Sequence, residues 1–91
     1  MDPPAPFGWE VDLVEVLEHL VLAVRFRDGT SGEVRFDPAS MVGVFEGLKD
    51  PTAFRQVGVT FGAVTWESGV DLDPKHMHDQ IVANGGCVIY P

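Results

Sequence analysis

The sequence has few of the features on which disulfide-bonded, secreted or membrane proteins depend. Its 91 residues include one cysteine, Cys87, so no disulfide can form within the chain, and we expect a reducing, cytoplasmic setting. No apolar run reaches the ~18 residues that a membrane span needs. No basic region precedes an apolar block at the start of the chain, so we expect no cleaved signal peptide.

Basic residues are also scarce. Six lysines and arginines stand against fourteen aspartates and glutamates, which gives a formal net charge of −8. Because nucleic-acid binding needs a basic footprint, we expect no direct nucleic-acid partner. Solubility alone explains such a surplus of acid, and a basic protein partner is the second explanation.

Against this background, the stretch from Leu20 to Asp37 has the pattern of a β-hairpin. Apolar residues occupy every second position from Leu20 to Phe26, which is typical of a half-buried strand. The alternation resumes at Val34, after the turn-forming pair Asp28-Gly29. We therefore predict two antiparallel strands with one face toward a core.

The two faces restrict the register of this hairpin, because directly opposed residues share a face. A three-residue loop, Arg27-Asp28-Gly29 with Gly29 left-handed, satisfies the restriction. It sets three pairs opposite one another: Leu20 with Phe36, Leu22 with Val34, and Val24 with Gly32. Sliding the pairing by two residues, with Arg25 across from Glu33, also keeps the faces intact, so both registers stay open.

A further strand is predicted before the hairpin. The alternation that starts at Trp9 slips by one residue between Leu13 and Val14, which indicates a bulge or a strand start near Val14. A turn at Glu18-His19 then leads into the hairpin and completes a three-strand antiparallel meander. We interpret His19 as a solvated turn residue and not as a functional base.

Three Asp-Pro pairs predict the starts of short helices, because Asp is a preferred N-cap and Pro is preferred at the first helical position. The pairs are Asp37-Pro38, Asp50-Pro51 and Asp73-Pro74. Apolar side chains behind each pair are expected to face the core: Met41, Val42, Phe45 and Leu48 after the first, Ala53, Phe54 and Val57 after the second, and Met77 and Ile81 after the third. Asn84-Gly85-Gly86 is expected to end the third helix.

Between the second and third helices the strand pattern returns. It runs through Val59 and Phe61 to Val64 and Trp66, with Gly62 marking a turn or bulge. The sequence therefore predicts an α+β fold in which a small antiparallel β-sheet packs with two or three short helices. We assign residues 1–8 to a flexible Pro-rich leader, 9–84 to a single domain and 85–91 to an apolar tail that adds an edge strand or pairs two copies as a homodimer.

Reactive constellations are not evident in the sequence. His76 and His78 lie two positions apart on the predicted third helix, so they point to nearly opposite sides and cannot share a metal. We interpret both as solvated, and Cys87, with no base or cation beside it, as a bystander thiol. We assign no catalytic, cofactor-binding or metal-binding residue, and expect no cofactor and no enzymatic activity.

The order and spacing of these motifs resemble the domain of unknown function 2442 family. The residues that carry the resemblance are Val24-Arg25-Phe26-Arg27-Asp28-Gly29, Glu33-Val34-Arg35-Phe36-Asp37-Pro38, Gly43-Val44-Phe45 with Leu48, Asp50-Pro51 and Phe54, and Val64-Thr65-Trp66 with Gly69, Asp71-Leu72 and Pro74. They span about Val11 to Asp79, and the chain departs from the pattern after Met77.

The resemblance implies a compact bacterial α+β domain and no established activity, cofactor or catalytic residue. Members of that family are sometimes encoded beside small toxin-like proteins or fused to a helix-turn-helix domain, which this chain lacks, so the resemblance implies regulatory or antitoxin-like work. Our leading hypothesis is accordingly a non-enzymatic interaction or regulatory module, antitoxin-like or an adaptor, with a basic protein partner. The alternative is a small-molecule or metal-binding domain that uses the space beside the helix at Asp73, near Trp66 and Met77.

Overall fold

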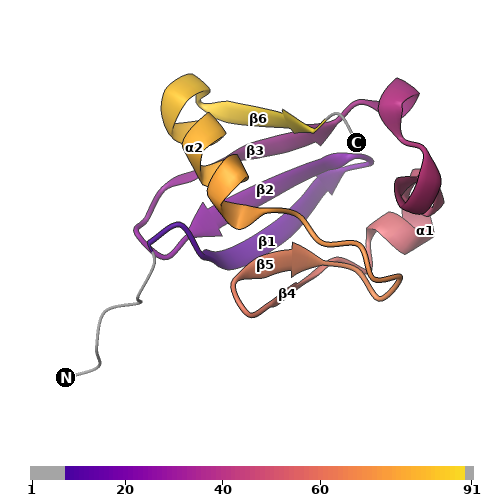
Figure 1. Ribbon diagram of the computed structural model, residues 1–91, viewed down its shortest axis with the longest axis horizontal. Helices are drawn as coiled ribbons and strands as arrows, with labels where there is room; N and C mark the ends of the chain where they lie inside the picture. The colour runs from indigo at the N-terminus through magenta and orange to yellow at the C-terminus, as the bar shows by residue number, and fades with distance from the viewer. Residues whose placement is uncertain (1–7, 90–91) are drawn as a thin grey trace.

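The computed structural model describes residues 8–89 of the 91-residue chain (Figure 1). Of the predicted leader over residues 1–8, only Gly8 falls among the described residues, and Tyr90 and Pro91 of the predicted tail fall outside them. The elements in chain order are β1 (Val11–Glu18), β2 (Val21–Phe26), β3 (Ser31–Phe36), the 3₁₀ helices η1 (Pro38–Ser40) and η2 (Gly43–Lys49), α1 (Pro51–Phe54), β4 (Gly58–Thr60), β5 (Ala63–Thr65), α2 (Pro74–Asn84) and β6 (Gly86–Ile89).

The main sheet has four strands in the order β1-β2-β3-β6 (Figure 1). The antiparallel meander β1-β2-β3 and the α+β class are confirmed. The sheet is mixed, because β6 pairs with β3 in parallel, and the prediction of a purely antiparallel sheet needs that correction. The elements after β3 return the chain to the end of the sheet where β3 starts, so β6 runs in the same direction as β3.

The first of the two hairpin registers is the one observed. Leu22 lies opposite Val34, and Val24 lies opposite Gly32. The loop closes through Gly29, whose φ is +91° and whose N–H donates to the Phe26 carbonyl at 3.0 Å. These are the features of the predicted type I turn with a bulge.

Strand β1 is irregular at both ends. Its pairing with β2 shifts between Val11 and Leu13, slightly before the predicted slip, and again between Val16 and Glu18. The first shift places Val11 in the core and leaves Leu13 half exposed. The bulge therefore accounts for the broken alternation in the sequence.

All three aspartates cap helices as predicted. Their side chains accept backbone N–H groups in the first turn, from Ala39 to Asp37 at 3.2 Å, from Thr52 to Asp50 at 3.0 Å and from Lys75 to Asp73 at 3.0 Å. The segment after Asp37 is not one helix, since extended backbone at Met41 and Val42 separates η1 from η2. Val42 is consequently 64% exposed, and its predicted place on the buried side was wrong.

One side of the main sheet carries the hydrophobic core, where α2, α1 and β5 bury Met77, Phe54 and Val64 against it. Trp66 is tied into this core, because its indole Nε1 donates to the Phe54 carbonyl at 2.9 Å. Helix α2 packs tightly against the sheet at Gly32, where a β-carbon would lie 2.8 Å from Cγ2 of Ile81. Among residues 8–89 no helix is long and apolar enough to span a bilayer.

The β4-β5 hairpin forms a separate two-stranded sheet beside β1 (Figure 1). Its two-residue turn, Phe61-Gly62, has φ values of +50° and +77°, the signature of a type I′ turn. Phe61, which the sequence pattern placed in the strand, is instead 99% exposed at this turn. The Gly62 carbonyl accepts the N–H of Val11 at 2.8 Å and so fastens this hairpin to the start of β1.

Candidate functional site

The side of the main sheet that faces away from the core, termed here the outer face, carries exposed apolar side chains. Leu13, Leu17 and Val88 are 50%, 48% and 46% exposed. Leu13 follows from the β1 bulge, and Val88 follows from the alternation of β6 next to the buried Cys87. Scattered exposed apolar residues are ordinary in soluble proteins, so the charges around these three decide what the face can bind.

The charged side chains of the outer face are predominantly acidic. Its carboxylates belong to Asp12, Glu15, Glu18 and Glu33, and its guanidinium groups belong to Arg25 and Arg35. The two arginines are engaged: Arg25 lies 2.9 Å from the Asp12 carboxylate, and Arg35 lies 3.1 Å from that of Glu33 and 3.9 Å from that of Glu18. Among the described residues Glu15 has no ion-pair partner. The outer face therefore has unneutralised negative charge near its exposed leucines.

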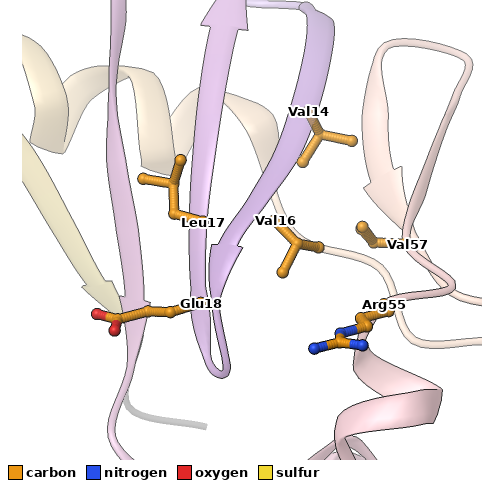
Figure 2. Close-up of a pocket in the computed structure, with 6 residues that line it drawn as sticks. All are labelled: Val14, Val16, Leu17, Glu18, Arg55 and Val57. Carbon is orange, nitrogen blue, oxygen red and sulfur yellow. The ribbon is translucent and has the colours of Figure 1, made fainter.

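An open hollow lies along the free side of β1 and is termed the edge groove. It is lined by Val14, Val16, Leu17, Glu18, Arg55 and Val57 and has a volume of about 490 Å³. Figure 2 shows Val14 and Val16 directed from β1 toward Val57, while Leu17 and Glu18 extend to the other side of the strand. Arg55 lies just after α1, on the side of the groove across from β1 (Figure 2), and makes no ion pair within residues 8–89.

The space predicted for a small ligand near Asp73 is occupied by side chains. Trp66 and Met77 are both buried in the hydrophobic core. A small hollow of about 130 Å³ lies beside Trp66, toward Leu48 and Gln56, and does not include Met77. Within residues 8–89 no group of three or more His, Cys, Asp and Glu side chains could hold a metal ion.

The two histidines of α2 lie apart, as their spacing predicted, but their environments differ. His76 is exposed, whereas His78 is only 16% exposed, so its prediction as a solvated residue was wrong. Its Nε2 lies 2.6 Å from Oδ2 of Asp28, and its ring packs edge-on against Phe26 at 4.9 Å. The Thr30 N–H and then His78 hold the pKa of Asp28 below its ordinary value. This contact fastens α2 to the β2-β3 loop.

Cys87 and His19 lie where the sequence analysis expected them. Cys87 is buried in β6, and burial raises the pKa of its thiol, because the thiolate would lose hydration there. A thiol of this kind is a poor nucleophile at neutral pH. His19 is exposed in the β1-β2 turn. Its ring centroid lies 5.6 Å from that of Phe54, and the two rings are nearly perpendicular.

Two features of this region were not anticipated from the sequence. The edge groove combines Arg55 and Val57 with β1, a pairing that only the tertiary arrangement creates. Phe61 was missed because its turn lacks the usual Asn-Gly or Asp-Gly pair. Gly62 was correctly expected to mark a turn or bulge, but Phe61 was assigned to the strand before it.

Comparison with known proteins identifies the family. A family model described as "Protein of unknown function (DUF2442)" matches residues 11–83, from the start of β1 almost to the end of α2. No curated protein and no solved structure matches the chain. The match covers the meander, the capped helices and the β4-β5 hairpin, and the chain belongs to the DUF2442 family of proteins of unknown function.

Proposed function

We propose that the chain is a non-enzymatic interaction module that binds a basic protein partner in the cytoplasm, in an antitoxin-like or adaptor role. The observation that carries the proposal is the outer face of the main sheet, where exposed leucines lie among carboxylates that outnumber the arginines. Apolar contacts supply binding energy, and complementary charge steers the partner and selects it. The net charge of −8 also favours association with a basic surface.

The surroundings of the titratable side chains support a role without catalysis. Asp37, Asp50 and Asp73 are committed to helix caps. The pair His78–Asp28 joins α2 to a loop, and its carboxylate also accepts the Thr30 N–H at 2.9 Å. Cys87 is a free and buried thiol, which is typical of proteins in a reducing compartment.

Affinity purification of the tagged full chain from its native cells, under several growth conditions, tests this function. We expect one basic protein to co-purify in a stoichiometric amount and to dissociate as salt is raised, because surface electrostatics are screened. Purification of the chain with no stoichiometric partner under any condition contradicts the proposal.

A matched pair of double variants tests whether the outer face makes the contact. The test variant Leu13→Ser/Leu17→Ser removes two half-exposed leucines from the outer face, and we expect it to lose the partner. The control variant Val42→Ser/Val82→Ser removes two apolar residues that are 64% and 65% exposed elsewhere. Equal retention in both variants contradicts the assignment of this face.

A further inference from the structure

The direction of the backbone groups in β2 follows from two hydrogen bonds. The Phe36 N–H donates to the Leu20 carbonyl at 3.0 Å, and the Phe26 N–H donates to the Thr30 carbonyl at 2.7 Å. Leu20 and Phe26 therefore direct their backbone groups toward β3. Because these groups alternate in direction along a strand, the intervening odd-numbered residues direct theirs toward β1.

The same alternation fixes the direction of the backbone groups in β1. Leu13 and Glu15 lie opposite Arg25 and Ala23 and bond to β2. Val14 and Val16 consequently present their N–H and C=O groups at the free edge, toward the edge groove. The register shift between Val11 and Leu13 reverses the alternation before Leu13, so the Val11 N–H also points away from β2 and donates to Gly62. Within residues 8–89, no such backbone partner serves Val14 or Val16 on that side.

This edge carries bulges but lacks two other protections that sheet edges usually have. Lysine and proline, which discourage strand addition, do not occur in β1. The two register shifts limit the regular stretch to Leu13–Val16, and the bond from Val11 to Gly62 closes one end. The remaining edge is short, so it suits a brief extended segment better than a whole sheet.

We propose that the free edge of β1 accepts an extended segment of the basic partner as an added strand, with the segment's apolar side chains in the edge groove and its Lys or Arg side chains beside Glu15. This inference rests on the proposed function and specifies its site and mode. Main-chain hydrogen bonds to Val14 and Val16 would supply affinity, and the alternating side chains would supply specificity.

The side chains on the two sides of β1 define the chemistry of the segment. Toward the edge groove, Val14, Val16 and Val57 offer an apolar wall. Toward the outer face, Glu15 is exposed and has no ion-pair partner among the described residues. Arg55 on the far wall repels positive charge, so the basic side chains belong on the Glu15 side. The matching segment alternates apolar and basic residues.

A second copy of the chain fits this edge poorly. Two β1 edges that pair antiparallel can use both Val14 and Val16 only when Val14 of one copy faces Val16 of the other. That register sets Glu15 directly opposite Glu15 of the second copy, and like charges in directly opposed positions destabilise strand pairing. A basic segment avoids this repulsion.

Nuclear magnetic resonance of the full chain with a synthetic probe tests the inference. The probe is acetyl-Lys-Val-Lys-Val-Lys-amide, and the charge control is the same peptide with Glu in place of Lys. We expect the lysine peptide to shift the amide signals of Leu13–Leu17 and to slow hydrogen exchange at Val14 and Val16 by about tenfold or more at saturation, because these amides become hydrogen-bonded. The glutamate peptide should produce neither effect.

Two N-methylated probes separate strand addition from simple charge attraction. One carries N-methyl groups on its valines and the other on its lysines, so each lacks donors along one edge of the extended peptide. Loss of binding with one and retention with the other supports an added strand, and the loss tells whether it runs antiparallel or parallel. Equal behaviour of the two probes overturns the inference.

A matched pair of charge reversals tests the place of the basic side chains. Glu15→Lys should raise the dissociation constant of the lysine peptide about two- to thirtyfold, because a reversal counts the energy of an exposed ion pair twice. The control Glu67→Lys makes the same change of charge in the exposed turn after β5. It should change the dissociation constant of the lysine peptide less than about twofold. Equal effects of the two substitutions overturn the assignment.

The outcomes distinguish this inference from the proposed function. A native basic partner that needs Leu13 and Leu17, but leaves exchange at Val14 and Val16 unchanged, overturns strand addition and leaves the proposed function intact. Hydrogen exchange at these residues could instead slow in a concentrated solution of the protein without any peptide. If sedimentation then gives the mass of a dimer, the edge binds a second copy, and the inference is overturned. Protection by the probe without any stoichiometric native partner supports the edge site and contradicts the function.

Discussion

Replacing Phe61 with asparagine should stabilise the protein, although it removes an aromatic side chain. Phe61 adopts a φ of +50° in the β4-β5 turn, and its side chain is 99% exposed. The left-handed conformation costs an ordinary residue about 1–2 kcal/mol, and asparagine tolerates it far better. Since the exposed ring contributes no burial, the substitution Phe61→Asn relieves strain at no cost in packing.

The expected gain is about 1 kcal/mol in the free energy of unfolding. The substitution also creates Asn-Gly, the preferred pair for a two-residue type I′ turn. For a domain of 60–100 residues, each kcal/mol shifts the melting temperature by about 4–8 °C. Thermal and urea unfolding followed by circular dichroism would detect a change of this size.

Leu20 provides a control that has a similar left-handed backbone conformation but for which we expect the opposite change in stability. Its φ is +65°, but only 8% of the residue is exposed. Leu20→Asn relieves similar strain and loses a buried leucine, which contributes about 1.5–3 kcal/mol, so we expect net destabilisation. A Phe61→Asn variant that melts at or below the wild-type temperature would refute the reasoning from backbone strain.

Three further predictions concern stability. Gly32→Ala should lower the free energy of unfolding by about 1–3 kcal/mol, because the added methyl group meets α2. Gly58→Ala, with open space around it, should leave the free energy of unfolding nearly unchanged, and chemical denaturation measures both. Trp66→Phe should cost about 1–3 kcal/mol by leaving the buried Phe54 carbonyl without its donor, measured the same way. The lowered pKa of Asp28 means that its stabilising contribution is present above the unfolded pKa, near 3.8, and disappears as the pH falls through the folded value. Asp28→Asn should therefore flatten the acid side of the melting-temperature profile, and an unchanged profile would contradict this assignment.

Local chemistry explains which parts of the fold were predictable. The loop Arg27-Asp28-Gly29 follows from alternation and from the need for a left-handed residue. The Asp-Pro helix starts follow from capping, which acts within one turn of the chain. The break between η1 and η2 was missed because helical spacing of apolar residues predicted one helix, whereas Met41 and Val42 are extended and η2 begins only at Gly43, whose φ is +62°.

Contacts between distant segments explain what the sequence did not reveal. Apolar composition indicated that the tail over residues 85–91 adds a strand or pairs two copies, but the parallel pairing of β6 with β3 depends on where α2 returns the chain. His78 contacts Asp28, fifty positions earlier, and no local pattern encodes that meeting. The edge groove likewise requires β1 and Val57 to be neighbours in space.

The buried position of Cys87 makes its thiol a probe for opening of the sheet. Alkylating reagents attack the thiolate, and this thiol is both enclosed beside Val34 and reluctant to ionise. Labelling of the native protein must therefore wait until β6 leaves β3, so its rate reports how often that border of the sheet opens. Since β1 and β6 are opposite borders, a ligand at β1 that slows this labelling would reveal that the four strands open together as one unit.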